Sequence, residues 1–479
     1  MISLVCFLVT FGKMPQDILK ILYPRREKMK RFFALILAFL CCVTLFACAN
    51  KDGDGEATST SGDGEGDATT AATTIATTTA AAATLTGEFS YKPVAKTREL
   101  ASGTYTKISA LESKYVASNS AAATFYKLDL PQFELAGAYY TPDADKILTR
   151  IDPAKKDTVL SGLAKGNKMS ENINAASGAT IRFRTNAKSI WINATLDTIP
   201  GRDFTLTTMG TTSIAVYTGS GNDYRFIENP DSPVGQSSIL VGQAINAEVQ
   251  LYNNGSYTEV LIELPIYAEV KSLSIGFSKT EISSGAKIAE PLKRDHAPVV
   301  FYGADITQGL SATGTTYAYA NIIGRMLGVD TINHGYVNGA KGEASMAEYI
   351  AGLDMSAFVM ELGMGMSTDE LQAKHYNFYK TVRDAKADIP IVLVSEPIFT
   401  KDLTSDDQAR LDIIKETYNK AIAEGDTNIY LIDGSKIFRN KELIDLYTSD
   451  YIHPNDLGVY NLALGVYDAI NSAFSAKAE

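Results

Sequence analysis

The most chemically suggestive residues of this chain lie near its C-terminal end, in the run Asp450-Tyr451-Ile452-His453-Pro454. A carboxylate three residues before a histidine can hold one imidazole nitrogen and fix the tautomer of the ring. The other nitrogen is then free to act as a base. We therefore take His453 as the candidate base and Asp450 as the group that orients it.

The other three of the four histidines are weaker candidates for such chemistry. His296 falls in a predicted linker between two domains. His334 is expected to pack beneath a loop, and His375 is expected on a solvated helix face. A mechanism that needs an imidazole base is therefore best assigned to His453.

Strand and helix patterns alternate in the part of the chain that must position this run, residues 297–479. Apolar runs typical of buried strands cover residues 299–302, 331–333, 357–360, 389–394 and 429–432. Helix patterns include Tyr317, Ala320, Ile323 and Met326 on one face, and residues 343–351, 368–387, 405–424 and about 456–474. Five such alternations predict a doubly wound, five-stranded parallel sheet with helices on both faces. Ligands of such α/β folds bind beyond the carboxyl ends of the strands, where His453 would lie.

Residues 102–284 show a different, all-β pattern. Short apolar or alternating runs, such as residues 180–184 and 189–193, are separated by turn signals rich in glycine and asparagine. Strands at this spacing without long intervening helices predict a β-sandwich, and more narrowly a jelly roll. Residues 285–296 are the predicted linker to the α/β domain.

The N-terminal region reads as an export signal followed by a tether. Residues 29–47 begin with Met29-Lys30-Arg31 and continue as an apolar run, and Cys48 follows in a motif that resembles the lipobox of bacterial lipoproteins. Residues 1–28 fit no part of a signal, so we interpret them as an upstream extension before the real start at Met29. Residues 48–101 are a flexible tether rich in Thr, Ala and Gly. The sequence thus predicts an exported bacterial lipoprotein, held at the cell-surface membrane through acylated Cys48.

The charge and the cysteine positions exclude several kinds of function. The chain has 44 Lys+Arg against 55 Asp+Glu, a net charge of −11, which argues against nucleic acid as a partner. All four cysteines lie within the first 48 residues. Neither predicted domain can therefore contain a disulfide, a thiolate metal site or a cysteine nucleophile.

Several motifs give residues 297–476 a resemblance to the SGNH/GDSL hydrolase family, whose domain is flavodoxin-like. The last block of the family has Asp-x-x-His-Pro, matched by Asp450, His453 and Pro454. Its first block reads Tyr-Gly-Ser-Ser-Ile-Thr-Gln-Gly in this subgroup, matched by the run at 302–309, and its second block contains Asn-x-Gly, matched at 333–335. The chain looks like the bacterial two-domain type in which a jelly roll precedes the SGNH domain. The resemblance implies an esterase acting on acylated carbohydrate, with no cofactor and no metal.

Two positions depart from the family pattern. The nucleophilic serine would stand at position 305, where this chain has Asp305. The third block should supply an oxyanion asparagine, but residues 361–367 contain none, and Gly365 is the best match to the missing residue. The resemblance leaves His453 as base, Asp450 as its orienting group and Gly335 as an oxyanion donor.

Three interpretations follow from these departures. The preferred one is a catalytically degenerate domain that binds an acylated polysaccharide or other glycan. The second is an active hydrolase in which Asp305 attacks and His453 activates water, since carboxylates are nucleophiles in other enzymes. The third is a divalent metal shared by Asp305, Asp450 and His453, although no metal-ligand spacing in the sequence supports it.

Overall fold

The computed structural model describes residues 104–142, 147–197, 206–228, 244–400, 402–438 and 441–476. The chain divides into two units, Met1–Thr77 and Thr78–Glu479, and all of these residues belong to the second unit. The predicted signal segment, Cys48 and the predicted tether lie outside the described residues. In the part of the chain that is described, no helix has the length and apolar character needed to cross a membrane.

The C-terminal half contains the predicted five-stranded parallel sheet. Its strands are β15 (Val299–Gly303), β16 (Thr331–Gly335), β17 (Ala357–Glu361), β18 (Ile391–Val394) and β19 (Ile429–Ile432). They pair in the order β16-β15-β17-β18-β19, and every pairing is parallel. The chain thus starts near one edge, steps outward once and then crosses to the other side, as in flavodoxin-like sheets. The sequence prediction of this sheet is confirmed.

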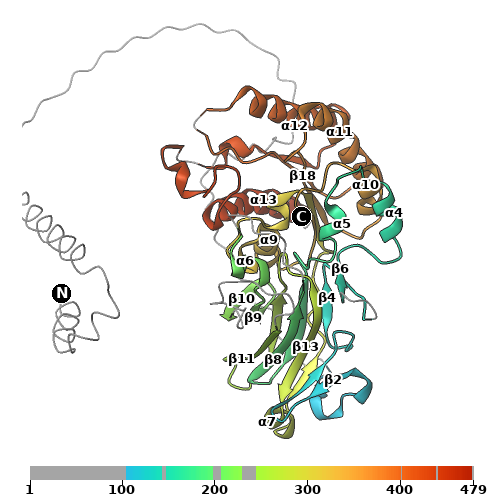
Figure 1. The fold of residues 1–479 in the computed structure, drawn as a ribbon, viewed down its shortest axis with the longest axis vertical. Coiled ribbons are helices and arrows are strands. Elements are labelled where there is room, and N and C mark those ends of the chain that lie inside the picture. The colour runs from blue at the N-terminus through green and yellow to red at the C-terminus, as the bar shows by residue number, and fades with distance from the viewer. Residues whose placement is uncertain are drawn as a thin grey trace, which may run out of the picture. The chain divides into compact units, whose positions relative to one another are not determined.

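Helices cover both faces of this sheet because its strands are apolar on both sides. Val299 and Phe301 join one buried cluster with α9 (Tyr319–Leu327) and α13 (Asp456–Ala476). Val300 and Tyr302 join the other, with α10 (Ala344–Ala351), α11 (Thr368–Ala385) and α12 (Ser405–Ala423). Successive side chains of a strand point to opposite faces, which explains the split. Helices α9 and α13 lie on one side of β18, and α10 and α11 lie on the other (Figure 1).

The preceding half is built from two antiparallel sheets. The first contains β1 (Thr106–Lys107), β14 (Lys287–Ala289), β7 (Thr180–Thr185), β12 (Thr258–Glu263), β9 (Ala215–Ser220) and β10 (Asp223–Glu228), in that order, with β4 (Glu134–Ala136) beside β7. The second contains β11 (Ala244–Gln250), β8 (Ser189–Leu196), β13 (Val270–Ser278), β3 (Ala123–Tyr126) and β2 (Val116–Asn119). Phe183 and Val260 of the first sheet share one core with Ile192 and Ile275 of the second. The two sheets therefore form a sandwich, and its jelly-roll connectivity stays a prediction.

Two segments differ from the predicted domain boundaries. The predicted linker at 285–296 contains β14, which pairs with β7 and buries Ile288 completely. The described part of the predicted sandwich domain contains a short ribbon, β5 (Tyr139–Tyr140) with β6 (Leu148–Thr149), and four short α-helices. These are α4 (Lys156–Ser161), α5 (Met169–Asn172), α6 (Thr208–Thr212) and α7 (Lys279–Ser283). Val159 of α4 and Met169 of α5 are buried in the core of the α/β domain, so these two helices pack with the parallel sheet.

Candidate functional site

Asp305 lies at the turn between β15 and a single helical turn, α8 (Asp305–Gln308). The turn needs glycine at position 303, because a Cβ there would lie 2.2 Å from Thr307 Oγ1 and 2.6 Å from the Glu361 carbonyl oxygen. The Asp305 side chain remains 16% exposed at the carboxyl end of β15. The fold thus presents this carboxylate at the edge of the sheet where ligands of such folds bind.

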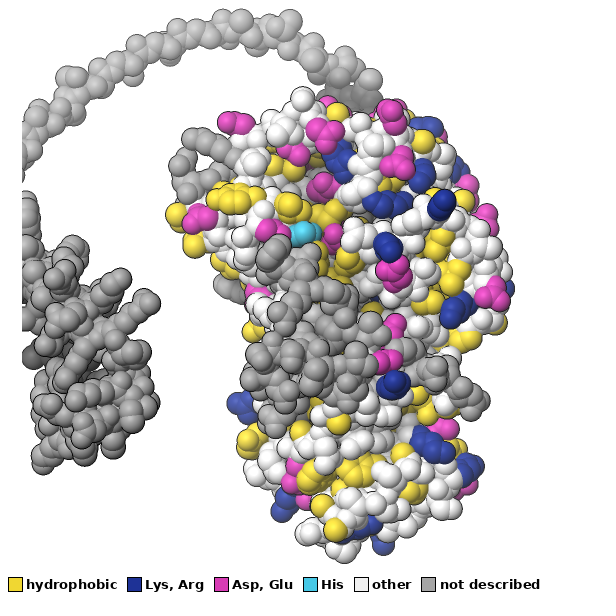
Figure 2. Space-filling model, in the orientation of Figure 1, with side chains coloured by type: hydrophobic (Ala, Val, Ile, Leu, Met, Phe, Trp, Pro, Cys, Tyr) yellow, Lys and Arg dark blue, Asp and Glu magenta, His cyan; other side chains and the backbone are white. Residues whose placement is uncertain are grey.

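His453 meets a carboxylate on each side of its ring. Its Nδ1 lies 2.7 Å from Asp450 Oδ2, and its Nε2 lies 3.6 Å from Asp305 Oδ2. The other oxygen of Asp450 accepts the backbone N–H groups of His453 (2.7 Å) and Ile452 (2.9 Å), which fixes the carboxylate against the ring. One face of the molecule shows a histidine between acidic side chains (Figure 2). The structure thus brings Asp305, His453 and Asp450 together.

These contacts shift the protonation of the ring and of Asp450. Burial of His453 disfavours the imidazolium, but the carboxylates of Asp305 and Asp450 outweigh it and raise the pKa of His453 above its ordinary value of 6.5. Burial also disfavours the charged form of Asp450. The hydrogen bonds from His453 and Ile452 outweigh that effect, and they lower the pKa of Asp450. Both shifts favour a charged pair, and a protonated imidazole cannot accept a proton from a nucleophile.

The second oxygen of Asp305 accepts a backbone N–H group that the sequence did not single out. The Asn338 N–H donates to Asp305 Oδ1 at 2.9 Å. Asn338 has φ +54°, a left-handed conformation that asparagine tolerates better than most residues. The signal that could have located it is the Asn338-Gly339 pair, a common turn former. The main-chain donor at the Asp305 carboxylate is thus Asn338.

Gly335, the predicted oxyanion donor, lies buried at the end of β16. Its N–H donates to Asn333 Oδ1 at 2.7 Å, and its carbonyl oxygen accepts Arg150 Nη1 at 2.6 Å. Both backbone groups are therefore engaged inside the strand end. The structure brings the residue three positions later, and not Gly335, to Asp305 as a donor.

The comparisons with known proteins agree with this architecture. A model of the GDSL-like lipase/acylhydrolase family matches residues 296–471. Residues 296–471 form a GDSL/SGNH hydrolase family domain. A model for the N-terminus of SGNH-hydrolase-type esterases matches residues 123–282, in the sandwich. The comparison with curated proteins found no match.

Two solved structures share the two-part fold. A GDSL-like lipase from Bacteroides ovatus is 23% identical, with a TM-score of 0.59, over 72% of this chain and 96% of that one. The salicylyl-acyltransferase SsfX3 from a tetracycline biosynthetic pathway is 16% identical, with a TM-score of 0.57, over 75% of this chain and 99% of that one. At these identities the likeness establishes the fold alone.

Arg150 lies in the segment before α4 and supports β16, the strand that carries the second block of the family pattern. It is fully buried, and its Nη1 donates to the carbonyl oxygens of Asn333 (2.8 Å) and Gly335 (2.6 Å). Its Nη2 donates to the Asn172 carbonyl oxygen (2.8 Å), and its guanidinium carbon lies 4.4 Å from the ring centre of Tyr336. A residue outside the family domain therefore fixes the strand end that leads to Asn338.

Ser177 adds a second support from the same side. Its hydroxyl donates to the Gln308 carbonyl oxygen (2.6 Å) and accepts Asn333 Nδ2 (3.1 Å). Gln308 in turn accepts the Val337 N–H through Oε1 (2.7 Å). This chain of bonds links the end of α8 to the residue just before Asn338, so it positions the donor against Asp305.

Two cations hold the third-block loop, where the family asparagine is absent. Lys341 Nζ donates to the Gly365 carbonyl oxygen, and a Cβ added to Gly365 would lie 2.8 Å from that ammonium. Lys341 therefore fills the space in which a side chain at position 365 would begin. Arg410 Nη1 donates to the Met366 carbonyl oxygen (2.6 Å), and its Nη2 contacts the Gly363 carbonyl oxygen.

Glu361 is a buried acid at the carboxyl end of β17, just before the third-block loop. Its Oε2 accepts the Thr307 hydroxyl at 2.9 Å, and its Oε1 has no hydrogen-bond partner among the described residues. Burial, followed by repulsion from Glu396 and Asp305, raises the pKa of Glu361 to about 8. Glu361 is thus mostly neutral at pH 7, a property that its position in the sequence did not reveal.

The remaining histidines lie away from the Asp305 carboxylate. His334 is buried as predicted, with Nδ1 2.9 Å from the Tyr336 hydroxyl, and burial lowers its pKa to about 3. The expected solvation of His375 is wrong, because the side chain is buried and its Nδ1 lies 2.8 Å from Thr417 Oγ1. His296 stacks on Phe474 with ring centres 4.1 Å apart.

A shared metal receives no support from the arrangement. The two ring nitrogens of His453 point in opposite directions, and each faces a different carboxylate, so the three side chains do not converge on one point. Across the described ranges, no group of three or more His, Cys, Asp or Glu side chains is placed to hold a metal ion.

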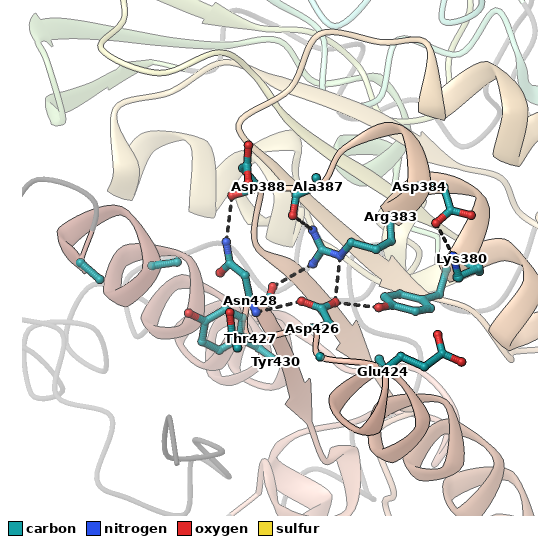
Figure 3. A pocket seen from close by; sticks show the side chains of 15 residues that line it. Lys380, Arg383, Asp384, Ala387, Asp388, Glu424, Asp426, Thr427, Asn428 and Tyr430 are labelled. Carbon is teal, nitrogen blue, oxygen red and sulfur yellow. Dashed lines mark hydrogen bonds and ion pairs between the residues drawn. The ribbon is translucent and has the colours of Figure 1, made fainter. Parts of the chain in front are cut away.

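A hollow of about 780 Å³ lies at the opposite edge of the sheet (Figure 3). Its lining includes Asp388 and Asn428, which come before β18 and β19 in the chain. The hollow therefore lies at the amino ends of these strands, whereas Asp305 lies at the carboxyl end of β15. Arg383 is bound there by Asp426 (2.8 Å) and by four backbone carbonyl oxygens. Because this guanidinium is fully engaged, we interpret it as a structural tie between α11 and the segment before β19.

Proposed function

We propose that this protein is a surface lipoprotein whose SGNH domain binds acylated carbohydrate and does not hydrolyse it through a serine ester. The observation that carries the proposal is the ion pair between His453 Nε2 and Asp305 Oδ2, at the position of the family nucleophile. Both nitrogens of the base face carboxylates, and position 305 carries a carboxylate in place of the hydroxyl of the family nucleophile.

Acyl transfer at this site is disfavoured on four grounds. Attack by the Asp305 carboxylate on an ester carbonyl would form a mixed anhydride, which is much higher in energy than a serine ester. Loss of a triad serine costs about 10⁶ in rate, and loss of one oxyanion donor costs about 10²–10³. The raised pKa of His453 also increases the fraction of the ring that is already protonated at a given pH and so cannot accept a proton.

The same groups suit recognition of a hydroxylated ligand. Asp305 and Asp450 present acceptors at the rim, and the imidazolium of His453 presents a donor, so sugar hydroxyls could replace the present contacts. The resemblance to two-domain carbohydrate esterases supports an acylated glycan as the class of ligand. The Leu45-to-Cys48 run supports anchoring at the cell surface, with residues 48–101 as the tether.

The test compares binding and turnover on one set of ligands. Calorimetry with acetylated and deacetylated xylan and mannan should detect binding, whereas 4-nitrophenyl acetate and the acetylated glycans should show negligible hydrolysis. Asp305→Ala should keep glycan affinity within a few-fold, because Asp450 and His453 still offer the sugar hydroxyls an acceptor and a donor. Robust hydrolysis that disappears in Asp305→Ala or His453→Ala would overturn the proposal.

A double substitution tests whether the site is an altered esterase site. Asp305→Ser restores a hydroxyl beside His453, and Gly365→Asn restores a side-chain donor in the third-block loop. The pair should produce measurable hydrolysis of 4-nitrophenyl acetate, and Asp305→Ser with His453→Ala is the control that should not.

The anchor is tested separately. Cys48→Ala should release the protein from the membrane fraction into the medium, because the acylated thiol is the proposed attachment. Unchanged membrane association of that variant would contradict the anchor and leave the glycan proposal standing.

One observation favours a second candidate, a hydrolase that uses Asp305 on an alkyl carbon. Asp305 Oδ1 is held by the Asn338 N–H while Oδ2 faces His453. Oδ2 could attack a saturated carbon and form an alkyl-aspartate ester, while the leaving group departs with the electron pair of the broken bond. Water deprotonated by His453 would then attack the Asp305 carboxyl carbon and expel the alcohol, with the developing oxyanion at the Asn338 N–H.

Isotope incorporation separates this route from simple binding. A single turnover in H₂¹⁸O would leave ¹⁸O in the Asp305 carboxylate, because water attacks the protein ester and not the substrate carbon. Mass spectrometry of the peptide containing Asp305 would detect it. Unlabelled Asp305 after product formation would rule out the alkyl-aspartate.

A further inference from the structure

Exposed apolar side chains are concentrated around His453. Within the described residues, six of the ten large hydrophobic side chains that are exposed belong to one stretch of 18 residues. These six form what we call the apolar ridge: Leu443, Leu446, Tyr451, Ile452, Leu457 and Tyr460. Tyr451 and Ile452, the two residues just before His453, are 61% and 58% exposed. Hydrophobic side chains also gather on the face that carries a histidine between acidic groups (Figure 2). Such a concentration on a folded domain marks a binding surface.

The ridge is fixed to the frame of the domain. Asn455 joins its two ends: its N–H donates to the Tyr447 carbonyl oxygen and its Nδ2 to the Leu446 carbonyl oxygen, both at 2.9 Å. The Asn455 side-chain oxygen accepts the Leu457 N–H at 3.1 Å, at the start of α13. The short helix η5 (Lys441–Leu446) and the first turn of α13 are thereby held against each other.

Asp450, whose carboxylate orients His453, also holds the backbone at the exposed pair Tyr451 and Ile452. Tyr451 has φ +62°, a strained conformation for a bulky residue, and its N–H donates to Thr448 Oγ1 at 3.0 Å. Asp450 Oδ1 accepts the Ile452 N–H at 2.9 Å, while Oδ2 of the same carboxylate meets the ring of His453. Backbone strain of this kind persists where the surroundings over-determine it, often beside binding sites.

The ridge is also continuous with the loop that follows Asp305. Asp456, at the start of α13, accepts the Thr313 N–H at 2.9 Å through Oδ1, and its Oδ2 contacts the Thr313 hydroxyl. A ligand group seated on the ridge would therefore lie beside a ligand group at the Asp305–His453 pair.

The charges of this stretch narrow the class of occupant. Asp445, Asp450 and Asp456 lie among the ridge residues, and the sequence from 442 to 476 contains no Lys or Arg. An anionic bilayer surface is repelled by such a rim, because membrane-surface segments depend on basic residues. The ridge instead suits a neutral ligand with a bulky apolar part.

We propose that the apolar ridge is a subsite for an apolar acyl substituent longer than acetyl, carried by the glycan ligand. This inference rests on the proposed function, since it names the acyl group of that ligand. Each additional methylene group buried on the ridge should raise affinity roughly fourfold, the equivalent of about 0.8 kcal/mol. The sugar would occupy the polar rim at Asp305 and His453, and the chain would extend over Tyr451 and Ile452.

The test compares two probes that differ only in the acyl group, 6-O-octanoyl-glucose and 6-O-acetyl-glucose. Calorimetry with the full chain should show at least about tenfold tighter binding of the octanoyl probe. Tyr451→Asn with Ile452→Ser should remove that preference, and asparagine tolerates the left-handed conformation at position 451. Leu457→Ser, an exposed helical position, should weaken the preference on its own. Ile422→Ser is the matched control, because Ile422 is 46% exposed on α12, outside the ridge, and should change nothing.

Each contrary outcome has a separate meaning. Equal affinity for the two probes, with acetylated glycan still bound, would overturn the subsite and leave the proposed function in place. Absence of any glycan binding by the wild type would overturn both the subsite and the proposed function. Binding to phosphatidylcholine vesicles that the double variant abolishes, or a dimer that it dissociates, would overturn the subsite in favour of a membrane or self-association surface.

Discussion

The two loops that flank Asp305 are held by different means. The second-block loop, residues 335–342, rests on buried groups from the preceding half of the chain, with Arg150 and Ser177 beneath it. The third-block loop, residues 363–366, is held near the surface by the side chains of Lys341 and Arg410.

This difference explains which donor the site keeps. The second-block loop offers a backbone N–H, that of Asn338, which any residue except proline would supply at that position if the loop keeps its course. The donor of the third-block loop would be a side chain, and replacement of one residue by Gly365 removes it. A donor made of backbone thus tolerates substitution, whereas a donor made of one side chain does not.

The largest expected effect comes from breaking the buried support. Arg150→Met leaves the carbonyl oxygens of Asn333, Gly335 and Asn172 without their donor, and should lower the free energy of unfolding by about 3–5 kcal/mol. Arg410→Met removes a guanidinium from the third-block loop, where solvent can replace part of the contact, and should cost about 1–2 kcal/mol. Denaturant unfolding of both variants measures the contrast. Equal losses would contradict the ranking of the two loops.

The sequence predicted the parallel sheet because each strand is a short apolar run between helical patterns. It also predicted which residue faces His453 at position 305, because the block order follows the strand ends. It could not predict the role of Arg150, which lies in a segment that reads as part of the sandwich but packs into the other core. Such long-range contacts leave no periodic signal. Asn338 was missed because the motif spacing that singled out Gly335 does not reveal where a backbone N–H points.

The next expected effect concerns the buried acid between the two loops. The pKa of Glu361 is raised from 4.5 to about 8, so the folded state resists losing a proton that the unfolded state releases. Stability should therefore fall as pH rises from about 4.5 towards 8, and Glu361→Gln should abolish most of that fall. At pH 8 and above, Glu361→Gln should raise the free energy of unfolding by about 2–4 kcal/mol relative to the wild type, since one pKa unit corresponds to about 1.4 kcal/mol. Thermal unfolding at pH 5 and pH 9 provides the measurement, and an equal shift at both would refute the titration.

His453 should show the same sign of pH dependence as Glu361, with a loss of stability as pH rises. Its pKa is raised in the folded state, so its contribution to stability is complete below the ordinary value near 6.5 and is lost as pH rises through the raised value. Asp305→Asn removes one of the two carboxylates and should lower the pKa of His453. Proton NMR of the imidazole Cε1–H against pH measures the pKa directly. An unchanged midpoint would show that the 3.6 Å contact with Asp305 carries no interaction in solution.

The smallest expected effect concerns Lys341, whose ammonium lies where a side chain at position 365 would begin. Lys341→Met should change the free energy of unfolding by less than about 0.5 kcal/mol, because an exposed ammonium on a carbonyl oxygen is a weak contact.

Gly365 has φ +68°, which asparagine tolerates, so the main obstacle to Gly365→Asn is the Lys341 ammonium 2.8 Å from the new Cβ. Gly365→Asn should therefore cost more in the wild type than in the Lys341→Met background, with a coupling of about 0.5–1 kcal/mol in a double-mutant cycle. Lys380→Met is the control for loss of charge, because Lys380 pairs with Asp384 within α11. Additive effects of Lys341→Met and Gly365→Asn would mean that the lysine does not occupy the space of the missing side chain. A positive coupling would mean that loss of this lysine lowers the cost of regaining a side-chain donor in the loop.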